Sequence, residues 1–192
     1  MEALFVSTGL IALAEIGDKT QLLAFLLATR FKKPWPIISG IFVATIVNHT
    51  LAGVVGAWIT VHVNPTILRC VLGLSFLAMA IWALIPDSIE DTETRSAKRF
   101  GIFGATLMTF FLAEMGDKTQ LATVAMAAHY GAALWVVAGT TLGMLIADVP
   151  AVFIGDRFAQ RIPIKLVHTI AAMLFALLGV ATLSGMGRRF GL

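Results

Sequence analysis

Two nearly identical charged motifs recur in this chain of 192 residues. The first is AEIGDKTQL at 14–22 and the second is AEMGDKTQL at 113–121. Inserting one charge at the centre of a bilayer costs roughly 2.5–3.5 kcal/mol on the translocon scale. A chain that keeps several such charges must pair them, expose them to water or bind an ion with them. The charged side chains of the motifs lie inside long apolar segments: Glu15, Asp18, Lys19, Glu114, Asp117 and Lys118.

The spacing within each motif predicts a polar stripe, because residues three and four apart are neighbours on one face of a helix. Glu15 and Asp18 therefore point the same way, about one turn apart. Lys19 follows Glu15 by four residues and can pair with it. Gln21 extends the stripe toward the next turn.

The two motifs together offer four carboxylates and the amide oxygens of Gln21 and Gln120. Such oxygen ligands suit Mg²⁺, Ca²⁺ or Mn²⁺, and the lone Cys70 makes no thiolate site for a softer metal. Four close carboxylates cannot all be ionised without a cation, so some should be protonated in the empty site. A site that holds either metal or protons is the physical basis of metal/proton exchange. Lys19 and Lys118 can neutralise part of the charge, or swing onto the carboxylates once the ion leaves.

The small and hydroxyl residues of the motifs have supporting roles in this interpretation. Gly17 lets another backbone approach closely, or lets the helix unwind locally and expose carbonyl groups. Thr20 and its equivalent Thr119 can satisfy such a carbonyl or add a hydroxyl ligand.

Three polar residues in other apolar segments are further candidates for the metal site or a proton relay. Asn48 can lend an oxygen ligand, and Asp148 a carboxylate or a proton relay. The alternative for both is an interhelical hydrogen bond worth about 0.6–2 kcal/mol. His49 occupies the position equivalent to Asp148, where it can carry a proton or serve as a packing donor.

The composition predicts an all-α, polytopic membrane protein. Hydrophobic residues make up 58% of the chain and charged residues 13%, with a mean hydropathy of +0.90. Soluble domains are usually about a quarter charged. The net charge of +3 comes from basic residues at helix ends, which set membrane topology, so nucleic acid is not an expected partner. No nucleotide motif is present, so we expect transport driven by gradients rather than an enzyme.

Six apolar segments are long enough to span a membrane, and they divide into two similar halves. An offset of 99 residues aligns the motifs, and also Gly40 with Gly139 and His49 with Asp148. Three helices is an odd number, so the halves must enter the membrane from opposite sides as inverted-topology repeats. The expected helices are 3–29, 36–60, 66–85, 101–128, 133–155 and 166–185. The expected units are a first repeat at 1–85, a charged cytoplasmic linker at 86–100 and a second repeat at 101–192.

The distribution of basic residues predicts the orientation. Lysine and arginine concentrate in the loops after the first, third and fifth helices, which the positive-inside rule puts in the cytoplasm. Both termini then lie on the periplasmic side of a bacterial inner membrane, although Arg188 and Arg189 argue mildly against this. The first apolar run has no basic residues before it, so we interpret it as a membrane helix rather than a signal peptide.

The doubled motif resembles a family of small membrane proteins with two E-x-G-D-[KR]-[TS] motifs. That family includes eukaryotic Golgi Ca²⁺/Mn²⁺ transporters and bacterial manganese exporters of the MneA type. The resemblance covers the whole chain and implies secondary cation transport, with the motif acids as the metal site. For a short bacterial-looking form, it implies Mn²⁺ efflux. The matching residues are Glu15, Gly17, Asp18, Lys19, Thr20, Glu114, Gly116, Asp117, Lys118 and Thr119.

Four hypotheses remain open at this point. The first is a Mn²⁺ exporter driven by proton entry, which works by alternating access between the repeats. The second is a Ca²⁺/H⁺ antiporter. The third is a membrane scaffold with structural ion pairs, and the fourth is a small-solute exporter. The expected partners are membrane lipid, a divalent cation and protons, with no resident cofactor.

Overall fold

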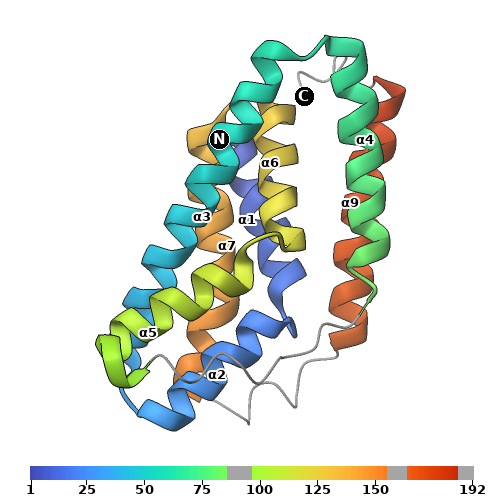
Figure 1. Ribbon diagram of the computed structural model, residues 1–192. Helices are drawn as coiled ribbons and strands as arrows, with labels where there is room; N and C mark the ends of the chain where they lie inside the picture. Colours follow the sequence, from blue (N-terminus) through green and yellow to red (C-terminus); the bar gives the residue numbers. More distant parts are fainter. Residues whose placement is uncertain (86–96, 155–163, 186–192) are drawn as a thin grey trace.

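The computed structural model describes residues 1–85, 97–154 and 164–185, and every regular element in these ranges is an α-helix (Figure 1). The predicted all-α class is therefore confirmed. The predicted linker lies mostly outside the described residues, as does most of the basic loop before the last helix. The helices are α1 (Glu2–Glu15), α2 (Lys19–Phe31), α3 (Pro34–His62), α4 (Pro65–Trp82), α5 (Ala97–Glu114), α6 (Lys118–Tyr130), α7 (Ala133–Ile154) and α9 (Ile164–Ser184).

Three of the described helices are long and apolar enough to cross a membrane. They are α3 with 29 residues, α4 with 18 residues, and 21 residues of α7. A transmembrane helix needs about 20 predominantly apolar residues. Two shorter apolar helical stretches, Gly101–Glu114 and His168–Ser184, accompany them.

Two helices that we expected to be continuous, 3–29 and 101–128, are broken inside the motifs. The chain leaves the first helix after Glu15 and begins the next at Lys19. The second motif breaks in the same way. The prediction of continuous helices was therefore wrong, whereas the interpretation that Gly17 lets the helix unwind is confirmed.

A glycine in the left-handed region makes each break. Gly17 has a φ of 84° and Gly116 a φ of 79°, values that cost other residues about 1–2 kcal/mol. Asp18 and Asp117 follow in extended conformation and are the N-cap residues of α2 and α6. The backbone N–H of Asp18 also donates to the carbonyl of Glu15 at 3.0 Å, which closes a tight turn between the two helices.

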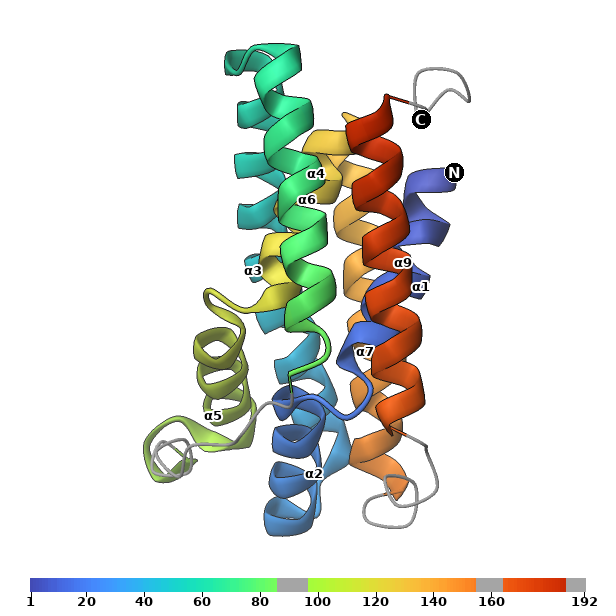
Figure 2. The same cartoon turned by 90° about the vertical axis from the view of Figure 1, so that its right-hand side faces the viewer.

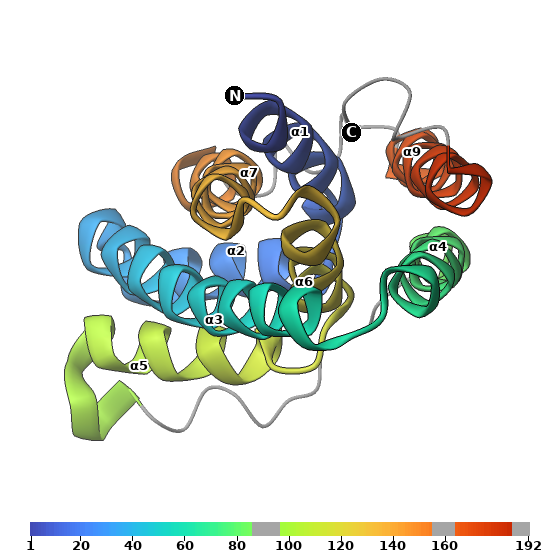
Figure 3. The ribbon, with the colours of Figure 1, turned by 90° about the horizontal axis from the view of Figure 1, so that it is seen from above.

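The two halves of the chain exchange packing partners. The broken segment α1–α2 packs on α7, and the broken segment α5–α6 packs on α3, so each lies against the unbroken helix of the other half. Seen from above, these six helices form one group, while α4 and α9 pack chiefly on each other beside it (Figure 3). Figure 2 shows the α4–α9 pair from its own side, in front of α6 and α1.

The helix crossings between the halves are equivalent. A Cβ added to Gly40 would lie 2.7 Å from Cβ of Thr106, and one added to Gly139 would lie 2.9 Å from Cβ of Ser7. Thr106 and Ser7 are separated by the same 99 residues as Gly139 and Gly40. The α3–α5 and α7–α1 crossings therefore use the same positions of each half, and both bring a broken helix close to an unbroken one.

Candidate metal centre

The two breaks bring carboxylates from both halves together inside the protein. One carboxylate oxygen each from Glu15, Glu114 and Asp117 lies within 4.8 Å of the others, and all three side chains are buried. The fourth motif carboxylate, Asp18, is also fully buried. These groups sit where helices end and begin, because each break separates its glutamate from its aspartate.

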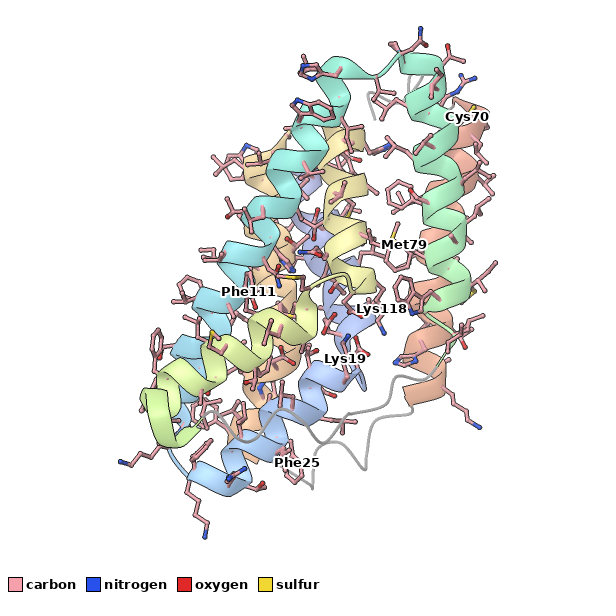
Figure 4. All side chains as sticks on the ribbon, viewed as in Figure 1. Lys19, Phe25, Cys70, Met79, Phe111 and Lys118 are labelled. Carbon is pink, nitrogen blue, oxygen red and sulfur yellow. The ribbon has the colours of Figure 1, made fainter. Side chains whose placement is uncertain are left out.

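The motif lysines form ion pairs across the two halves. Lys19 Nζ lies 3.0 Å from Asp117 Oδ1, and Lys118 Nζ lies 3.0 Å from Asp18 Oδ1. The pairing of Lys19 with Glu15 that helical spacing predicted is therefore not found, because the break removes these residues from a common helix. Figure 4 shows both lysines near the breaks, in the middle of the molecule.

The two ion pairs differ in their access to solvent. The Lys19 side chain is 26% exposed, whereas that of Lys118 is 2% exposed. The carboxylates that they contact, Asp117 and Asp18, are both buried. The centre thus has one lysine that reaches the surface and one that is enclosed.

Each motif threonine fixes the glutamate of its own motif. Thr20 Oγ1 donates to Glu15 Oε2 at 2.6 Å, and Thr119 Oγ1 donates to Glu114 Oε2 at 2.9 Å. The threonines therefore contact carboxylates rather than the exposed carbonyls considered from the sequence. Oε1 of each glutamate is buried and has no hydrogen-bond partner among the described residues. One oxygen of each carboxylate is oriented by the protein, and the other is available to a ligand.

The glutamine amide oxygens, which we expected to be ligands, face the backbone of the breaks. Gln21 Oε1 accepts a hydrogen bond from the N–H of Gly17 at 2.8 Å, and Gln120 Oε1 accepts one from the N–H of Gly116 at 2.7 Å. Gln21 and Gln120 stand at the third position of α2 and α6, from which a glutamine can reach back past the helix start, and each accepts from the glycine that precedes the N-cap aspartate. In this structure the oxygens therefore bind the backbone of the breaks.

The candidates on α3 and α7 are all fully buried, but they differ in their partners. Asn48 makes interhelical hydrogen bonds, which was one of its two interpretations. His49 and Asp148 have no hydrogen-bond partner among the described residues. Asp148 lies close enough to Glu15 and Glu114 for their charges to interact. A fifth buried carboxylate therefore lies within electrostatic range of the motif glutamates.

One contact of the centre was not predicted from the sequence. His168 is buried, and its Nε2 lies 2.9 Å from the carbonyl oxygen of Ile16 in the first break. The contact joins α9 to the first motif across 152 residues of sequence. No local pattern around a single histidine indicates such a partner.

Comparison with known proteins gives a consistent result. A family model described as "Divalent cation/proton antiporter GDT1" matches residues 3–91 and 102–189. A Vibrio cholerae protein named "Putative manganese exporter" is 50% identical over 183 residues, which are 95% of this chain and 90% of that protein. A GDT1-like protein of Synechocystis is 33% identical, covering 90% of this chain and 92% of its own. GDT1-like protein 3 of indica rice is 33% identical over 91% of this chain and 71% of its own. No solved structure matches.

Proposed function

Because the chain belongs to the GDT1 family of divalent cation/proton antiporters, we propose that it exports Mn²⁺ from the cytoplasm in exchange for protons. The observation that carries the proposal is the buried cluster of Glu15, Glu114 and Asp117, with oxygen atoms from both halves within 4.8 Å. The name of the Vibrio cholerae relative supports the choice of Mn²⁺.

The charges of the centre account for an exchange of metal and protons. The four motif carboxylates and two motif lysines leave two negative charges when all are ionised. One divalent cation or two protons would neutralise them, and an intramembrane site strongly favours neutrality. The ligands in this proposal are Glu15, Asp18, Glu114 and Asp117, with the lysines as internal counter-ions. The metal then competes with both lysines and protons for the same oxygens.

The membrane arrangement that we propose is six spans in two inverted repeats. Each broken segment, α1–α2 or α5–α6, forms one span, and the exchange of packing partners between halves supports a pseudo-twofold relation. Figure 2 shows α1 beginning and α9 ending toward the same end of the molecule, as an even number of spans requires. With the positive-inside rule, this end faces the periplasm of a bacterial inner membrane. Alternating access follows when the halves shift around the shared centre.

Two fully buried residues at equivalent positions of α7 and α3, Asp148 and His49, are the proposed proton route. Asp148 neighbours Glu15 and Glu114, and His49 stands at the equivalent position of the other half. A proton held by Asp148 can pass to a motif glutamate as the metal leaves. The different side chains at these equivalent positions make the two halves chemically unequal.

Ca²⁺ is the second candidate substrate, because the same oxygen ligands suit it. Purified protein in proteoliposomes, given Mn²⁺ and Ca²⁺ separately with an imposed pH gradient, distinguishes the two. We expect Mn²⁺ flux that dissipates the pH gradient. Ca²⁺ flux without Mn²⁺ flux would transfer the proposal to Ca²⁺. Absence of both fluxes would refute cation transport and favour a scaffold or a small-solute exporter.

The direction of transport is tested in cells. A deletion strain should accumulate Mn²⁺ and lose tolerance to added Mn²⁺, and the wild-type protein should restore both. Asp18→Asn and Asp117→Asn should fail to restore them, because each removes a proposed ligand. Full restoration by these variants would support structural ion pairs in a scaffold instead.

A further inference from the structure

Each helix break is tied to the unbroken helix of the other half by a single glutamine side chain. In the first motif, Gln21 Oε1 accepts the N–H of Gly17 at 2.8 Å, while its Nε2 donates to the carbonyl oxygen of Ala147 on α7 at 2.9 Å. One end of the amide therefore binds the break, and the other end binds the opposite half. The side chain is buried, so water does not readily replace either contact.

The second motif has the same hydrogen-bond pattern with one substitution, in a more open setting, because Gln120 is half-buried and Gly116 is exposed. Gln120 Oε1 accepts the N–H of Gly116 at 2.7 Å, and its Nε2 donates to Oδ1 of Asn48 on α3 at 2.7 Å. Asn48 is the equivalent of Ala147, so a side chain here takes the place of a backbone carbonyl. Nδ2 of Asn48 in turn donates to the carbonyl oxygen of Phe111 on α5 at 3.2 Å, which fixes the orientation of its amide.

These hydrogen bonds restrain the turns that carry the motif carboxylates. Gly17 stands between Glu15 and Asp18, so the hydrogen bond to its N–H fixes the turn that separates the two acids. The glycine alone does not fix this turn, because glycine adopts many backbone conformations at little cost. The glutamine supplies the missing restraint, and it relates the turn to the opposite half of the site.

We propose that Gln21 and Gln120 are positioning residues of the cation site. Each glutamine, with its two hydrogen bonds, forms a clamp that holds the break of its own motif in register with the unbroken helix of the opposite half. Asn48 completes the Gln120 clamp. The proposal rests on the proposed function, and it assigns the glutamines a role other than the direct ligation expected from the sequence. In each glutamine the amide oxygen already accepts a short hydrogen bond from an N–H group, and the amide nitrogen is held by a second contact. The oxygen is therefore poorly placed to turn toward an ion.

The two clamps differ, because only the Gln120 clamp includes a second side chain, that of Asn48. Asn48→Ala removes the outer contact of Gln120 and leaves the Gln21 clamp intact. The variants Asn48→Ala and Gln120→Leu should therefore share one defect, and combining them should add little. Combining Asn48→Ala with Gln21→Leu should multiply two separate defects, because these residues belong to different clamps.

Hydrogen–deuterium exchange of the purified protein measures the clamps without relying on transport. We expect Gln120→Leu and Asn48→Ala to speed exchange at Gly116 by about tenfold, with Gly17 unaffected, since a lost hydrogen bond of ordinary strength gives a change of this size. Gln21→Leu should do the reverse. Asn64→Ala, a change at an exposed helix cap, is the matched control and should affect neither break. Unchanged exchange at Gly116 in Gln120→Leu would overturn the proposal.

Mn²⁺ transport by the same variants in proteoliposomes separates positioning from ligation. Loss of a residue that orients ligands typically costs about 10–100-fold in metal affinity or activity, so Asn48→Ala and Gln120→Leu should each show such a loss, and the double variant no more. A rise in the KM for Mn²⁺ in Gln120→Leu, with Asn48→Ala transporting normally, would identify Gln120 as a ligand and overturn the proposal. If wild-type protein moved no Mn²⁺ while the exchange changes appeared as expected, the clamps would stand and the proposed function would fail.

Discussion

Asp18→Asn should destabilise the protein much more than Asp117→Asn, although both aspartates make ion pairs of the same length. Each pair has an Nζ–Oδ1 distance of 3.0 Å. The difference lies in the lysine that is left behind. Lys118, the partner of Asp18, is 2% exposed, whereas Lys19, the partner of Asp117, is 26% exposed and can extend its ammonium group toward solvent.

The size of the difference follows from this burial. Removing one partner of a buried pair costs about 3–5 kcal/mol, because the remaining buried charge loses its nearest counter-charge, whereas a partly exposed pair contributes about 1 kcal/mol or less. Both substitutions relieve repulsion with Glu114, and Asp117→Asn relieves more of it, because Asp117 lies within 4.8 Å of Glu15 and Glu114. We therefore expect the loss in Asp18→Asn to exceed that in Asp117→Asn by about 2–4 kcal/mol in the free energy of unfolding.

The assay is equilibrium unfolding of each purified variant in detergent, with a chelator present so that metal binding does not contribute. The double variant Asp18→Asn with Lys118→Met is the matched control. It removes both charges of the buried pair and should recover most of the stability lost in Asp18→Asn. Equal losses in the two single variants, or a double variant no more stable than Asp18→Asn, would refute the reasoning.

Three further perturbations test other parts of the centre. Gly17→Ala should lower the free energy of unfolding by about 1–2 kcal/mol, because alanine is strained at a φ of 84°. Thermal unfolding measures this loss, with Gly9→Ala as the control, because a Cβ added at Gly9 meets open space. Thr119→Val removes the hydroxyl that orients Glu114, and calorimetry should show Mn²⁺ affinity reduced by about tenfold, whereas an unchanged affinity would exclude this role. Mn²⁺ binding to wild-type protein should weaken as pH falls, because protons and metal compete for the same carboxylate oxygens; affinity that does not change between neutral and acidic pH would contradict proton exchange at this site.

The convergence of the motif acids is the part of the site that the sequence predicted best. Charges at this density inside apolar segments require partners, and the 99-residue offset indicated that each motif would find the other. Glu15, Glu114 and Asp117 do lie together. The partners of the lysines were not predictable in the same way, because Lys19 and Asp117 meet only through the packing of whole helices across the two halves.

The sequence did contain an indication of the helix breaks, but the long apolar segments favoured continuous helices. Asp18-Lys-Thr-Gln21 has the spacing of a capping box, with an N-cap residue followed three positions later by glutamine. Weighing this signal together with Gly17 would have ended one helix and started another at the motif. The contact of His168 with Ile16 had no such local signal, since it depends on how the α4–α9 pair packs beside the other helices.

The most direct test of the metal centre is a structure of the Mn²⁺-loaded protein with anomalous scattering recorded at the manganese absorption edge. We predict a single strong anomalous peak between the carboxylate oxygens of the proposed ligands Glu15, Asp18, Glu114 and Asp117, at the junction of the two breaks. A peak bound elsewhere in the protein, with no motif carboxylate among its ligands, would contradict the account.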